Sequence, residues 1–572
     1  MNRPLVAIAL PLALLSAQAT GAKAALVISK DPSRNVTCSN EFSCSATKAN
    51  ANLNVRDLSK LLNARDLTLI AGSEALDIDF KVPFAWTRPR TLTLQAHRSV
   101  VFEEPVTVQG AGSLDISTNY PGGSGGALDF VNRGKVDFWD ASSNLTINSQ
   151  PYTLVSDLPT LAQRINANSY GYIALIKDYD ASADGVYSGS PAASFSGALE
   201  GLGHKISNLS INDPSPYDAV GLIGTVDEAE VRNIGLPNAT IVAQDSTSVG
   251  ALIGSANEIG IEHCYVTGTV QGGQYSTVGG LIGGLSRNYG YYPSTVRDSR
   301  SFARVSGGLY STAGGLIGTA GGSQLPSAIE NTYATGKVIG GTYVGGLVGY
   351  ASGPAITDSH ATGAVAMAQG QSYGYAGGLA GSSSGDIQRA YSLGYVKASD
   401  GAYAGGLVGW GYGGKIYWTY ANGSVKAGDS ATAGGLIGDN ENADVRFSYA
   451  TGAVSIGQNG YAGGLVGQHR HLLSYSFSTG AVTAGTGSTA GGAVGADYGR
   501  KDVFRVYWDT DTSGISDASA GAGNPPNDYG IAPLTSAELQ SGLPRGFDRS
   551  MWARDPGINN GFPYLRSVPP PQ

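Results

Sequence analysis

Two carboxylates near the end of the chain form the best-placed pair for acid–base chemistry. They occur in the segment WDTDTSG, where one residue separates Asp509 from Asp511. If this segment is a strand, alternation places both carboxylates on one face. Paired carboxylates serve as acid and base in glycoside hydrolysis, so the pair would suit an enzyme that degrades polysaccharides. A polar cap at the end of a domain would contain the same residues, and we favour the cap over the catalytic pair.

Other residues that often serve in catalysis form no recognisable site. None of the six histidines belongs to an HExxH pair, so the sequence has no zinc-peptidase motif. The segment HRH at 469–471 could contact a metal, but a solvated turn is the more ordinary interpretation. GWGYGG at 409–414 formally matches GxGxxG, yet no helix is expected after it, so a dinucleotide site is rejected. We therefore predict no catalytic residue, no metal and no cofactor.

Aromatic residues gather in several glycine-rich segments and offer a surface for binding instead. The segments are RNYGYYPST, QSYGYAGG and GWGYGG, and their rings are those of Tyr289, Tyr291, Tyr292, Tyr373, Tyr375, Trp410 and Tyr412. Exposed rings with polar neighbours suit the faces of sugars or the anchor residues of a protein. The same rings could instead fold over the chain and cover apolar surface, because tyrosine is commonly half-buried. The sequence leaves both interpretations open.

A short glycine-rich motif recurs through the chain and must position these rings. Its forms include VGLIG, GGLIG, GGLVG and GGLAG, and ten copies align on one aliphatic residue. The aligned residues are Leu222, Leu252, Leu281, Leu316, Leu347, Leu379, Leu407, Leu436, Leu465 and Ala493, at intervals of 28 to 35 residues. So steady a period is typical of a repeat architecture, and it outweighs a phosphate-binding interpretation of any single copy.

A second motif lies between these anchors and supplies an aromatic position. Examples are CYVTGTV, TYATGKV and SYATGAV, and the residues at that position are Tyr265, Tyr333, His360, Tyr391, Tyr420, Tyr449 and Phe477. Short alternating segments precede them and predict strands. One coil cannot bury its own inner face, so neighbouring coils must stack. We predict an all-β fold, a right-handed parallel β-solenoid of about ten coils in which the leucines and the aromatic residues form inward ladders.

The paired motifs resemble the GLUG repeat of bacterial secreted and surface proteins. The resemblance covers residues 201–511, which is over half of the chain. It implies a relation to filamentous-haemagglutinin-like adhesins and to some large surface peptidases, although the peptidase motif is missing here. Segments of residues 50–150 alternate cleanly between apolar and polar residues, with Gly, Asn or Asp at the breaks, and they resemble the irregular β-helical rungs of the haemagglutinin-like proteins. Neither the long secretion domain of that family nor an autotransporter barrel is visible, which leaves the export route open.

The N-terminal residues predict export. An apolar run from Leu5 to Leu15 is followed by small residues, and Ala19 and Ala24 offer two cleavage points. The run is too short to cross a bilayer and no later stretch reaches about 18 uninterrupted apolar residues, so no transmembrane segment is predicted. A net charge of −8 without a basic patch argues against a nucleic-acid partner. We expect an extracellular or cell-surface location, with the periplasm as an alternative and with an outer-membrane partner for export.

Three cysteines fit an oxidising compartment. Cys38 and Cys44 are six residues apart and are predicted to form a disulfide that staples the N-terminal cap. The closed loop is short, so its entropic gain is only about 2 kcal/mol. Cys264 has no evident partner and is predicted to be a small buried apolar residue within a strand.

The flanking segments complete a five-part organisation. We predict a signal peptide at 1–24, an N-terminal cap and β-helical segment at 25–150, a junction at 151–200, the GLUG solenoid at 201–511 and a C-terminal cap at 512–572. A short helix is expected at 157–168, because Leu158, Leu161 and Ile165 share one face. Three aromatic residues of the last segment are expected to cover the open edge of the final coil, namely Trp552, Phe562 and Tyr564.

The function expected from these features is non-catalytic binding. We predict an exported interaction protein that adheres to a glycan, to the matrix, or to a host or neighbouring cell surface. The 35-residue interval from Leu281 to Leu316 holds Tyr289, Tyr291 and Tyr292, and insertions in a solenoid often mark the binding face. A β-helical polysaccharide lyase or glycoside hydrolase is the first alternative. A purely structural extracellular spacer is the second.

Overall fold

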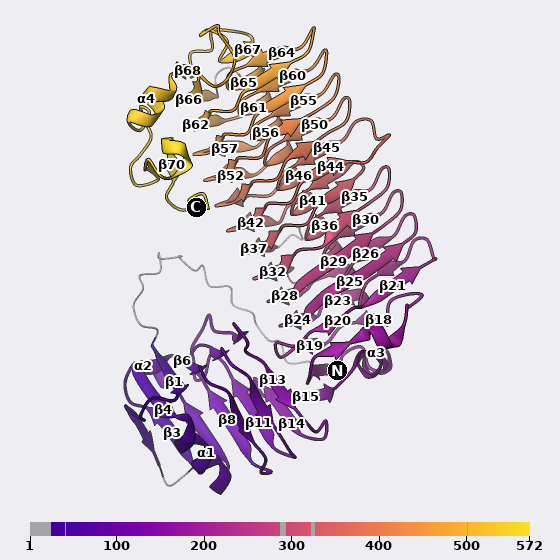
Figure 1. Ribbon diagram of the computed structural model, residues 1–572, viewed down its shortest axis with the longest axis vertical. Helices are drawn as coiled ribbons and strands as arrows, with labels where there is room; N and C mark the ends of the chain where they lie inside the picture. Colours follow the sequence, from indigo (N-terminus) through magenta and orange to yellow (C-terminus); the bar gives the residue numbers. More distant parts are fainter. Residues whose placement is uncertain (1–23, 40–41, 286–292, 322–326, 500–501, 572) are drawn as a thin grey trace. The chain divides into compact units, whose positions relative to one another are not determined.

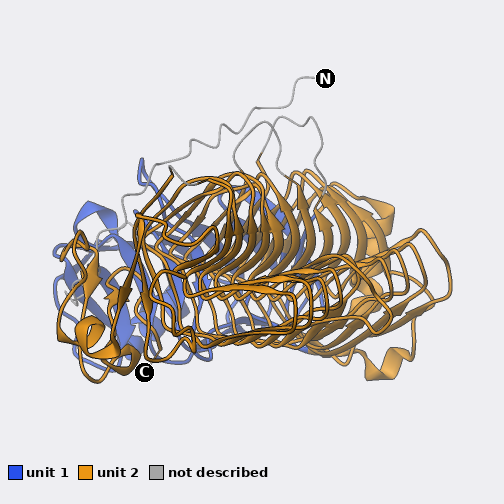
Figure 2. Cartoon of the chain, turned by 90° about the horizontal axis from the view of Figure 1, so that it is seen from above, with its two compact units in different colours: residues 1–157, 172–178, 200–204 blue, residues 158–171, 179–199, 205–572 orange. Residues whose placement is uncertain are grey.

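The computed structural model describes residues 24–39, 42–285, 293–321, 327–499 and 502–571, and it is a parallel β-solenoid of about 17 turns. The chain separates into two compact units (Figures 1 and 2). Unit 1 comprises residues 1–157, 172–178 and 200–204, and unit 2 comprises the remainder. The segment 151–200, expected to be a simple junction, is thus divided between the two units.

Unit 1 is built from irregular rungs with aromatic residues inside. One sheet consists of β4 (Asn50–Asn54), β1 (Ala25–Ser29), β6 (Asp77–Phe80), β9 (Val100–Phe102) and β12 (Leu128–Phe130), and a second of β7 (Phe84–Trp86), β10 (Val106–Val108) and β13 (Val136–Phe138). Phe80 and Phe102 are fully buried, and their rings stack at 5.1 Å. The amphipathic helix α1 (Val55–Ala64) buries Leu58 and Leu62 against this core.

Unit 2 carries two long parallel sheets. The ten-strand sheet has one strand at each predicted anchor: β22 (Ala219–Val220), β26 (Ser248–Gly250), β30 (Thr277–Gly279), β35 (Thr312–Gly314), β40 (Tyr343–Gly345), β45 (Tyr375–Gly377), β50 (Tyr403–Gly405), β55 (Thr432–Gly434), β60 (Tyr461–Gly463) and β64 (Thr489–Gly491).

The twelve-strand sheet follows each anchor and adds one strand at either end. Its members are β18 (Ala192–Phe195), β23 (Ile223–Asp227), β27 (Ile253–Asn257), β31 (Ile282–Leu285), β36 (Ile317–Gly321), β41 (Val348–Ser352), β46 (Ala380–Ser383), β51 (Val408–Gly411), β56 (Ile437–Asn440), β61 (Val466–His469), β65 (Val494–Asp497) and β67 (Ala522–Asn524). The prediction of about ten coils was therefore too low. The coils that contain β18 and β67, and the rungs of unit 1, lack the glycine-leucine anchor by which coils were counted in the sequence.

The glycines of the anchor permit a sharp corner between these two sheets. All nine anchor leucines are fully buried inside the coils. A Cβ atom at Gly345 would lie 1.9 Å from the carbonyl oxygen of Val348, and one at Gly349 would lie 2.6 Å from the oxygen of Gly318. No side chain fits at such distances, so these glycines are required by close approach of the backbone and not by a phosphate ligand.

A third face of unit 2 carries the aromatic ladder, which points outward and not inward as predicted. Strands such as β38 (Tyr333–Ala334), β43 (His360–Ala361), β48 (Tyr391–Ser392), β53 (Tyr420–Ala421) and β58 (Tyr449–Ala450) bury their second residue. The rings stack on the outer side at 4.6 to 5.1 Å. The interior has no room for them, because a Cβ at Gly346 would already lie 2.8 Å from the Cβ of Ala361.

The C-terminal segment covers part of this ladder instead of the open edge of the last coil. It contains α4 (Ser536–Ser541), β69 (Trp552–Ala553) and β70 (Tyr564–Leu565). Trp552 is fully buried, with its ring centroid 6.1 Å from that of Tyr449 and 5.8 Å from that of Phe477. Phe562 belongs to the same buried cluster. Trp552 and Phe562 therefore pack on the side of the solenoid, against its outward aromatic rings, and not on the open edge of the final coil as predicted.

Three further aromatic residues strengthen the docking of this segment at the expense of backbone strain. Trp418, Phe447 and Tyr475 have positive φ angles of 54°, 50° and 49°, and their side chains pack against the covered cluster. A left-handed conformation costs an ordinary residue about 1–2 kcal/mol. Coils outside the covered region have Asn331 and Asp358 at the equivalent corner, and these residue types tolerate that conformation.

Two predicted local elements lie where the sequence placed them. Helix α3 (Leu158–Ala167) buries Leu158, Leu161 and Ile165. Cys38 and Cys44 are bonded to each other between β2 (Val36–Cys38) and β3 (Ser43–Ala46). Cys264 is buried as expected, but it occupies the corner between β28 (Gly260–Glu262) and β29 (Tyr265–Gln271) and not a strand. In the described part of the chain, no helix is long and apolar enough to cross a membrane.

These positions predict the reactivity of the thiols. In native mature protein we expect no free thiol at Cys38 or Cys44, and we expect Cys264 to react with an alkylating reagent only after unfolding, because it is shielded from solvent. Mass-spectrometric thiol mapping with and without denaturant measures both. Alkylation of Cys38 in native, non-reduced protein would contradict the disulfide and the oxidising destination.

Candidate functional site

The outer side of the corner between the two long sheets is the most developed surface of unit 2. In each coil, one strand of the ten-strand sheet and one strand of the twelve-strand sheet each place one side chain on the outer surface. These two side chains lie next to each other at the corner. The first row is Ser248, Thr277, Thr312, Tyr343, Tyr375, Tyr403, Thr432 and Tyr461. The second row is Ser255, Gly284, Thr319, Tyr350, Ser382, Trp410, Asp439 and Gln468. We call the line where these rows meet the outer corner.

Six half-buried rings in the middle of the outer corner form an aromatic cluster, which consists of Tyr343, Tyr350, Tyr375, Tyr403, Trp410 and Tyr412. In the first row, Tyr375 stacks on Tyr343 at 5.1 Å and on Tyr403 at 5.4 Å. The rows also touch each other, since Tyr375 and Trp410 stack at 4.9 Å. The cluster is therefore one connected surface that spans both sheets.

Tyr412 connects two rings of the cluster that a serine separates. Ser382 is fully buried and separates Tyr350 from Trp410 in the second row. The Tyr412 ring stacks on Trp410 at 4.7 Å, and its hydroxyl lies 3.0 Å from that of Tyr350. Tyr412 thus occupies the space that Ser382 leaves. Burial, together with the hydrogen bond to Tyr412, raises the pKa of Tyr350 to about 12, so its hydroxyl keeps its proton at any physiological pH.

Charged and polar groups follow the cluster toward the C-terminal end of the outer corner. Glu441 accepts a hydrogen bond of 2.9 Å from the Trp410 indole. Arg470 binds the carboxylate of Asp439 and donates to Gln468 at 2.8 Å. Burial raises the pKa of Asp439 to about 6, although the Arg470 guanidinium opposes this shift. At neutral pH this end of the corner carries two carboxylates and one guanidinium.

Small hydroxyl-bearing residues line the outer corner on the other side of the cluster. They surround a recess of about 430 Å³, which is lined by Ser248, Ser255, Thr277, Gly284, Leu285, Thr319, Gly321, Tyr350 and Ser352. Because Tyr350 belongs both to the recess and to the aromatic cluster, the two features are continuous. None of these lining residues is charged.

The structure unites some of the predicted aromatic residues and separates others. Tyr375, Trp410 and Tyr412 lie in the aromatic cluster, whereas Tyr373 is 71% exposed in a turn outside it. Tyr289, Tyr291 and Tyr292 lie outside the described residues. Tyr343, Tyr350 and Tyr403 were not predicted. Tyr343 and Tyr403 precede the glycine pair in YVGGL and YAGGL, as Tyr375 does, so their shared register was a usable signal.

The proposed carboxylate pair has a structural task. Asp509 ends β66 (Val503–Asp509) and is fully buried, where it accepts a 2.6 Å hydrogen bond from the Ser536 hydroxyl. Asp511 accepts a bond of 2.9 Å from the backbone N–H of Ser536. Both carboxylates hold the first residue of α4 in place. This arrangement agrees with the cap interpretation and offers no carboxylate pair directed at a substrate.

The histidine-rich segment is also different from the expected solvated turn. His469 ends β61 and is fully buried beside Asn440, with 3.3 Å between the Asn440 amide nitrogen and the His469 Nδ1. Burial lowers the pKa of His469 to about 3, so it is neutral at physiological pH. Within the described ranges, no three His, Cys, Asp or Glu residues come together as a metal site would require.

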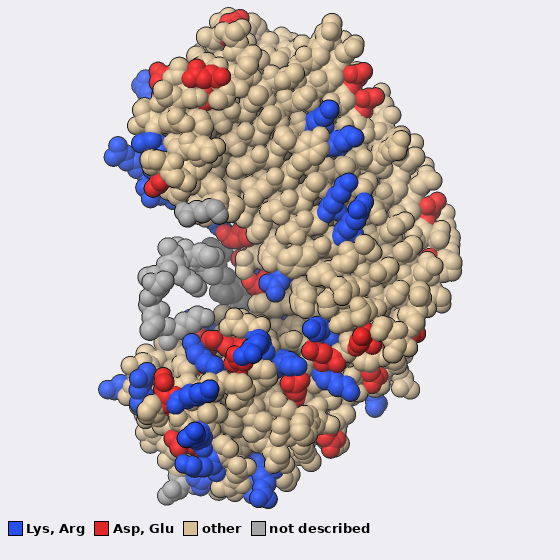
Figure 3. All heavy atoms as spheres, in the orientation of Figure 1, with Lys and Arg blue, Asp and Glu red and all other residues tan. Residues whose placement is uncertain are grey.

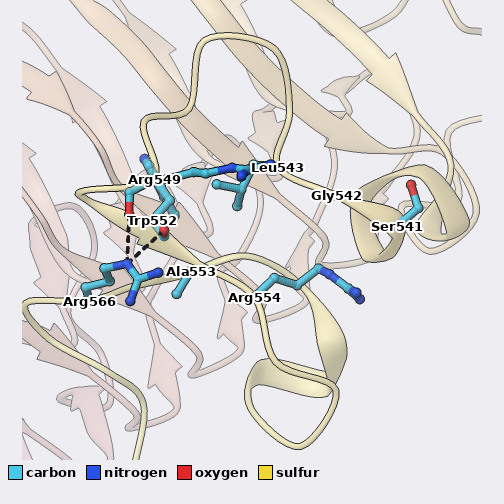
Figure 4. Close-up of a pocket in the computed structure, with 8 residues that line it drawn as sticks. All are labelled: Ser541, Gly542, Leu543, Arg549, Trp552, Ala553, Arg554 and Arg566. Atoms are coloured by element: carbon cyan, nitrogen blue, oxygen red, sulfur yellow. Dashed lines mark hydrogen bonds between the residues drawn. The ribbon is translucent and has the colours of Figure 1, made fainter.

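A second recess, of about 260 Å³, lies in the C-terminal segment. Figure 4 shows the residues that line it, among them Arg549, Arg554 and Arg566. The Arg566 guanidinium donates to the carbonyl oxygens of Arg549 at 2.8 Å and Trp552 at 3.2 Å, and Arg554 donates to that of Gln540. Two of the three arginines therefore brace the local backbone, which makes this recess a weaker candidate than the outer corner.

Comparison with known proteins identifies the repeat. A family model described as the GLUG motif matches residues 310–339 and 340–366. The chain is a GLUG-repeat protein. The two matched copies meet at residues 339 and 340, just before β40, so the first strand of the aromatic cluster lies in the second copy. The haemagglutinin-like resemblance of residues 25–150 stays a prediction.

Relatives of these GLUG repeats are distant. Halomucin of Haloquadratum walsbyi is 33% identical over 171 residues, which are 29% of this chain and 2% of Halomucin, so the chain spans only a small part of that relative. Two solved structures align at low similarity. One is a Bacteroides ovatus protein assigned as an immunoglobulin A1 protease (TM-score 0.31, 15% identity, 73% of this chain and 93% of that one). The other is named IgA1 Protease (TM-score 0.32, 18% identity, 51% and 21%). Scores this low carry no argument about activity.

Proposed function

We propose that this GLUG-repeat protein is an exported, non-catalytic binding protein that attaches to a surface glycan through the outer corner. One observation carries this proposal: six aromatic side chains, five from two sheets and Tyr412 from the residue after β51, form a connected, half-buried surface without being needed in the core. The anchor leucines already fill the interior, so the rings are not required to hold the coils together. Rings combined with hydroxyl groups are the side chains that suit sugars.

The enzymatic alternative has less support in the geometry. A glycan-degrading enzyme needs an acid and a base placed on either side of the scissile bond. Asp509 and Asp511 are occupied with α4, and at the outer corner Asp439 is held by Arg470 while Glu441 is bonded to Trp410. A purely structural spacer would have no reason to gather aromatic rings on one outer line. Extracellular location remains part of the proposal, with the predicted signal at 1–24 as its support.

Removal of two rings tests this proposal. We expect Trp410→Ala combined with Tyr412→Ala to weaken attachment to glycan-bearing surfaces about 10- to 30-fold, because aromatic anchors dominate binding energy. Adhesion of purified protein to an arrayed glycan panel measures the effect, and the urea midpoint shows whether the fold is retained.

Tyr529→Ala is the matched control, since Tyr529 is 84% exposed and lies outside the outer corner. Attachment that is unchanged in the folded double variant would remove the outer corner from consideration. Release of oligosaccharides from any panel member, abolished by Asp439→Asn or Asp509→Asn, would replace binding by catalysis.

A further inference from the structure

We propose that the outer corner takes an extended, neutral polysaccharide that lies along the solenoid axis, with the hydroxyl-lined recess and the aromatic cluster as consecutive parts of one site. This inference rests on the proposed function, because it names the ligand class of the same surface. The observations that carry it are the distribution of charge, the length of the surface and the orientation of its rings.

Charge is the first argument. From the coil of Ser248 to the coil of Tyr403, no outward residue of either row is charged. At the C-terminal end of the corner, the Arg470 guanidinium is bound to Asp439, and Glu441 adds a further negative charge. Among the residues that the structure describes, an anionic polymer would therefore find no free cation in the two rows and a net negative charge at their end. A neutral polymer meets no such penalty.

Length is the second argument. The rows between Ser248 and Tyr403 contain six coils, and strands stack about 4.8 Å apart, so the uncharged surface extends about 24 Å along the axis. A single terminal sugar would occupy only a small part of this distance. Several consecutive sugar rings of an extended chain would fill it. Figure 3 shows that unit 2 also has broad surface with few charged side chains on the face in view.

Ring orientation is the third argument. Tyr343, Tyr375 and Tyr403 are nearly parallel, with interplanar angles of 11° and 13°, so each covers the face of its neighbour. Their edges and hydroxyl groups are what remains for a ligand. Burial raises the pKa of all three, so these hydroxyls stay protonated and can donate hydrogen bonds. A ligand rich in neutral hydroxyl groups matches this surface, and so do the serine and threonine hydroxyls of the recess.

The test compares polymers of two charge classes on the intact mature chain. The neutral probes are a mixed-linkage β-glucan, a galactomannan and an arabinoxylan, and the acidic probes are polygalacturonate, alginate and hyaluronan. We expect at least one neutral probe to bind, with an affinity that changes less than about twofold between 0.05 and 0.5 M salt, because no ion pair is involved. Oligosaccharides of that probe should bind more tightly as they lengthen to several sugar units.

Variants at both ends of the site make the test specific. Thr319→Arg places a long charged side chain in the recess, and Tyr412→Ala opens the cluster; each should weaken binding of the neutral probe tenfold or more, while Tyr529→Ala should not change it. Asp439→Asn should strengthen binding of the acidic probes, because it frees Arg470. Urea midpoints of all variants distinguish lost binding from lost folding.

The outcomes separate this inference from the proposed function. Binding of acidic probes that is lost in Tyr412→Ala and falls with salt would overturn the neutral class while the corner remains a binding site. Attachment that survives periodate treatment of the target surface, yet is lost in Tyr412→Ala, would point to a protein ligand and would equally overturn the polysaccharide. If no probe binds and the corner variants attach normally, both proposals fail.

Discussion

Replacing Leu347 by Asp is expected to reduce the free energy of unfolding by about 5 kcal/mol or more, because it places an unpaired charge inside the stacked coils. Leu347 is fully buried, and the equivalent leucines of the neighbouring coils, Leu316 and Leu379, are too. In a solenoid each coil depends on the coils beside it, so the damage should spread to those neighbours. Urea denaturation followed by circular dichroism measures the change.

Tyr373→Asp serves as the control for this substitution. It adds the same charge only one coil away, at a solvent-exposed turn where φ is 61°, a conformation that aspartate tolerates. We expect its denaturation midpoint to stay close to that of the unaltered protein. If Leu347→Asp also kept that midpoint, the anchor would not be internal and the assignment of the core would be wrong.

Replacing Trp552 by Ala is expected to cost about 3–5 kcal/mol and to release the C-terminal segment from the solenoid. The Trp552 ring is fully buried and stacks on Phe547 at 4.5 Å, and both rings cover the outward ladder of Tyr449 and Phe477. Once uncovered, this ladder would be an exposed apolar patch that favours association. Limited proteolysis should therefore cleave within residues 535–566 much sooner, and light scattering should detect oligomers.

Met551→Ala is a suitable comparison, since Met551 is the adjacent residue and only partly buried in the same cluster. It should change stability by a smaller amount and leave the segment docked. Equal protease resistance of Trp552→Ala and the unaltered protein would show that the segment is held by other contacts, and the account of the covered ladder would need revision.

Binding at the outer corner and docking of the C-terminal segment depend on different features of unit 2, so they can be tested separately. The outer corner lies on the ten-strand and twelve-strand sheets, whereas the C-terminal segment covers the third face. A substitution at Tyr412 should therefore affect binding without releasing the segment, and a substitution at Trp552 should do the reverse. This independence is useful, because loss of attachment by a variant with intact folding then reports on the corner alone.

The solenoid and its inward leucines could be predicted from the amino-acid sequence alone. A steady period of 28 to 35 residues with one aliphatic anchor leaves few architectures open, since a single coil cannot bury its own inner face. The coils at either end of unit 2 and those of unit 1 could not be counted from the sequence. The strands there, such as β18 and β67, pair in register without repeating the anchor motif.

The tertiary structure decided which way the aromatic residues point and which of them meet. In TYATGKV the ring and the alanine alternate, and either could face inward; only the close approach of Ala334 to the backbone at Gly315 excludes the ring from the interior. The outer corner was only partly visible along the chain, because the shared register of three tyrosines indicated one row but not its contact with the second row. Tyr343, Tyr375 and Tyr403 are about 30 residues apart, and they become neighbours because in-register parallel strands stack equivalent positions about 4.8 Å apart. Tyr412 joins them for a reason that depends on two coils, because its ring stacks on Trp410 and fills the space above Ser382 of the preceding coil.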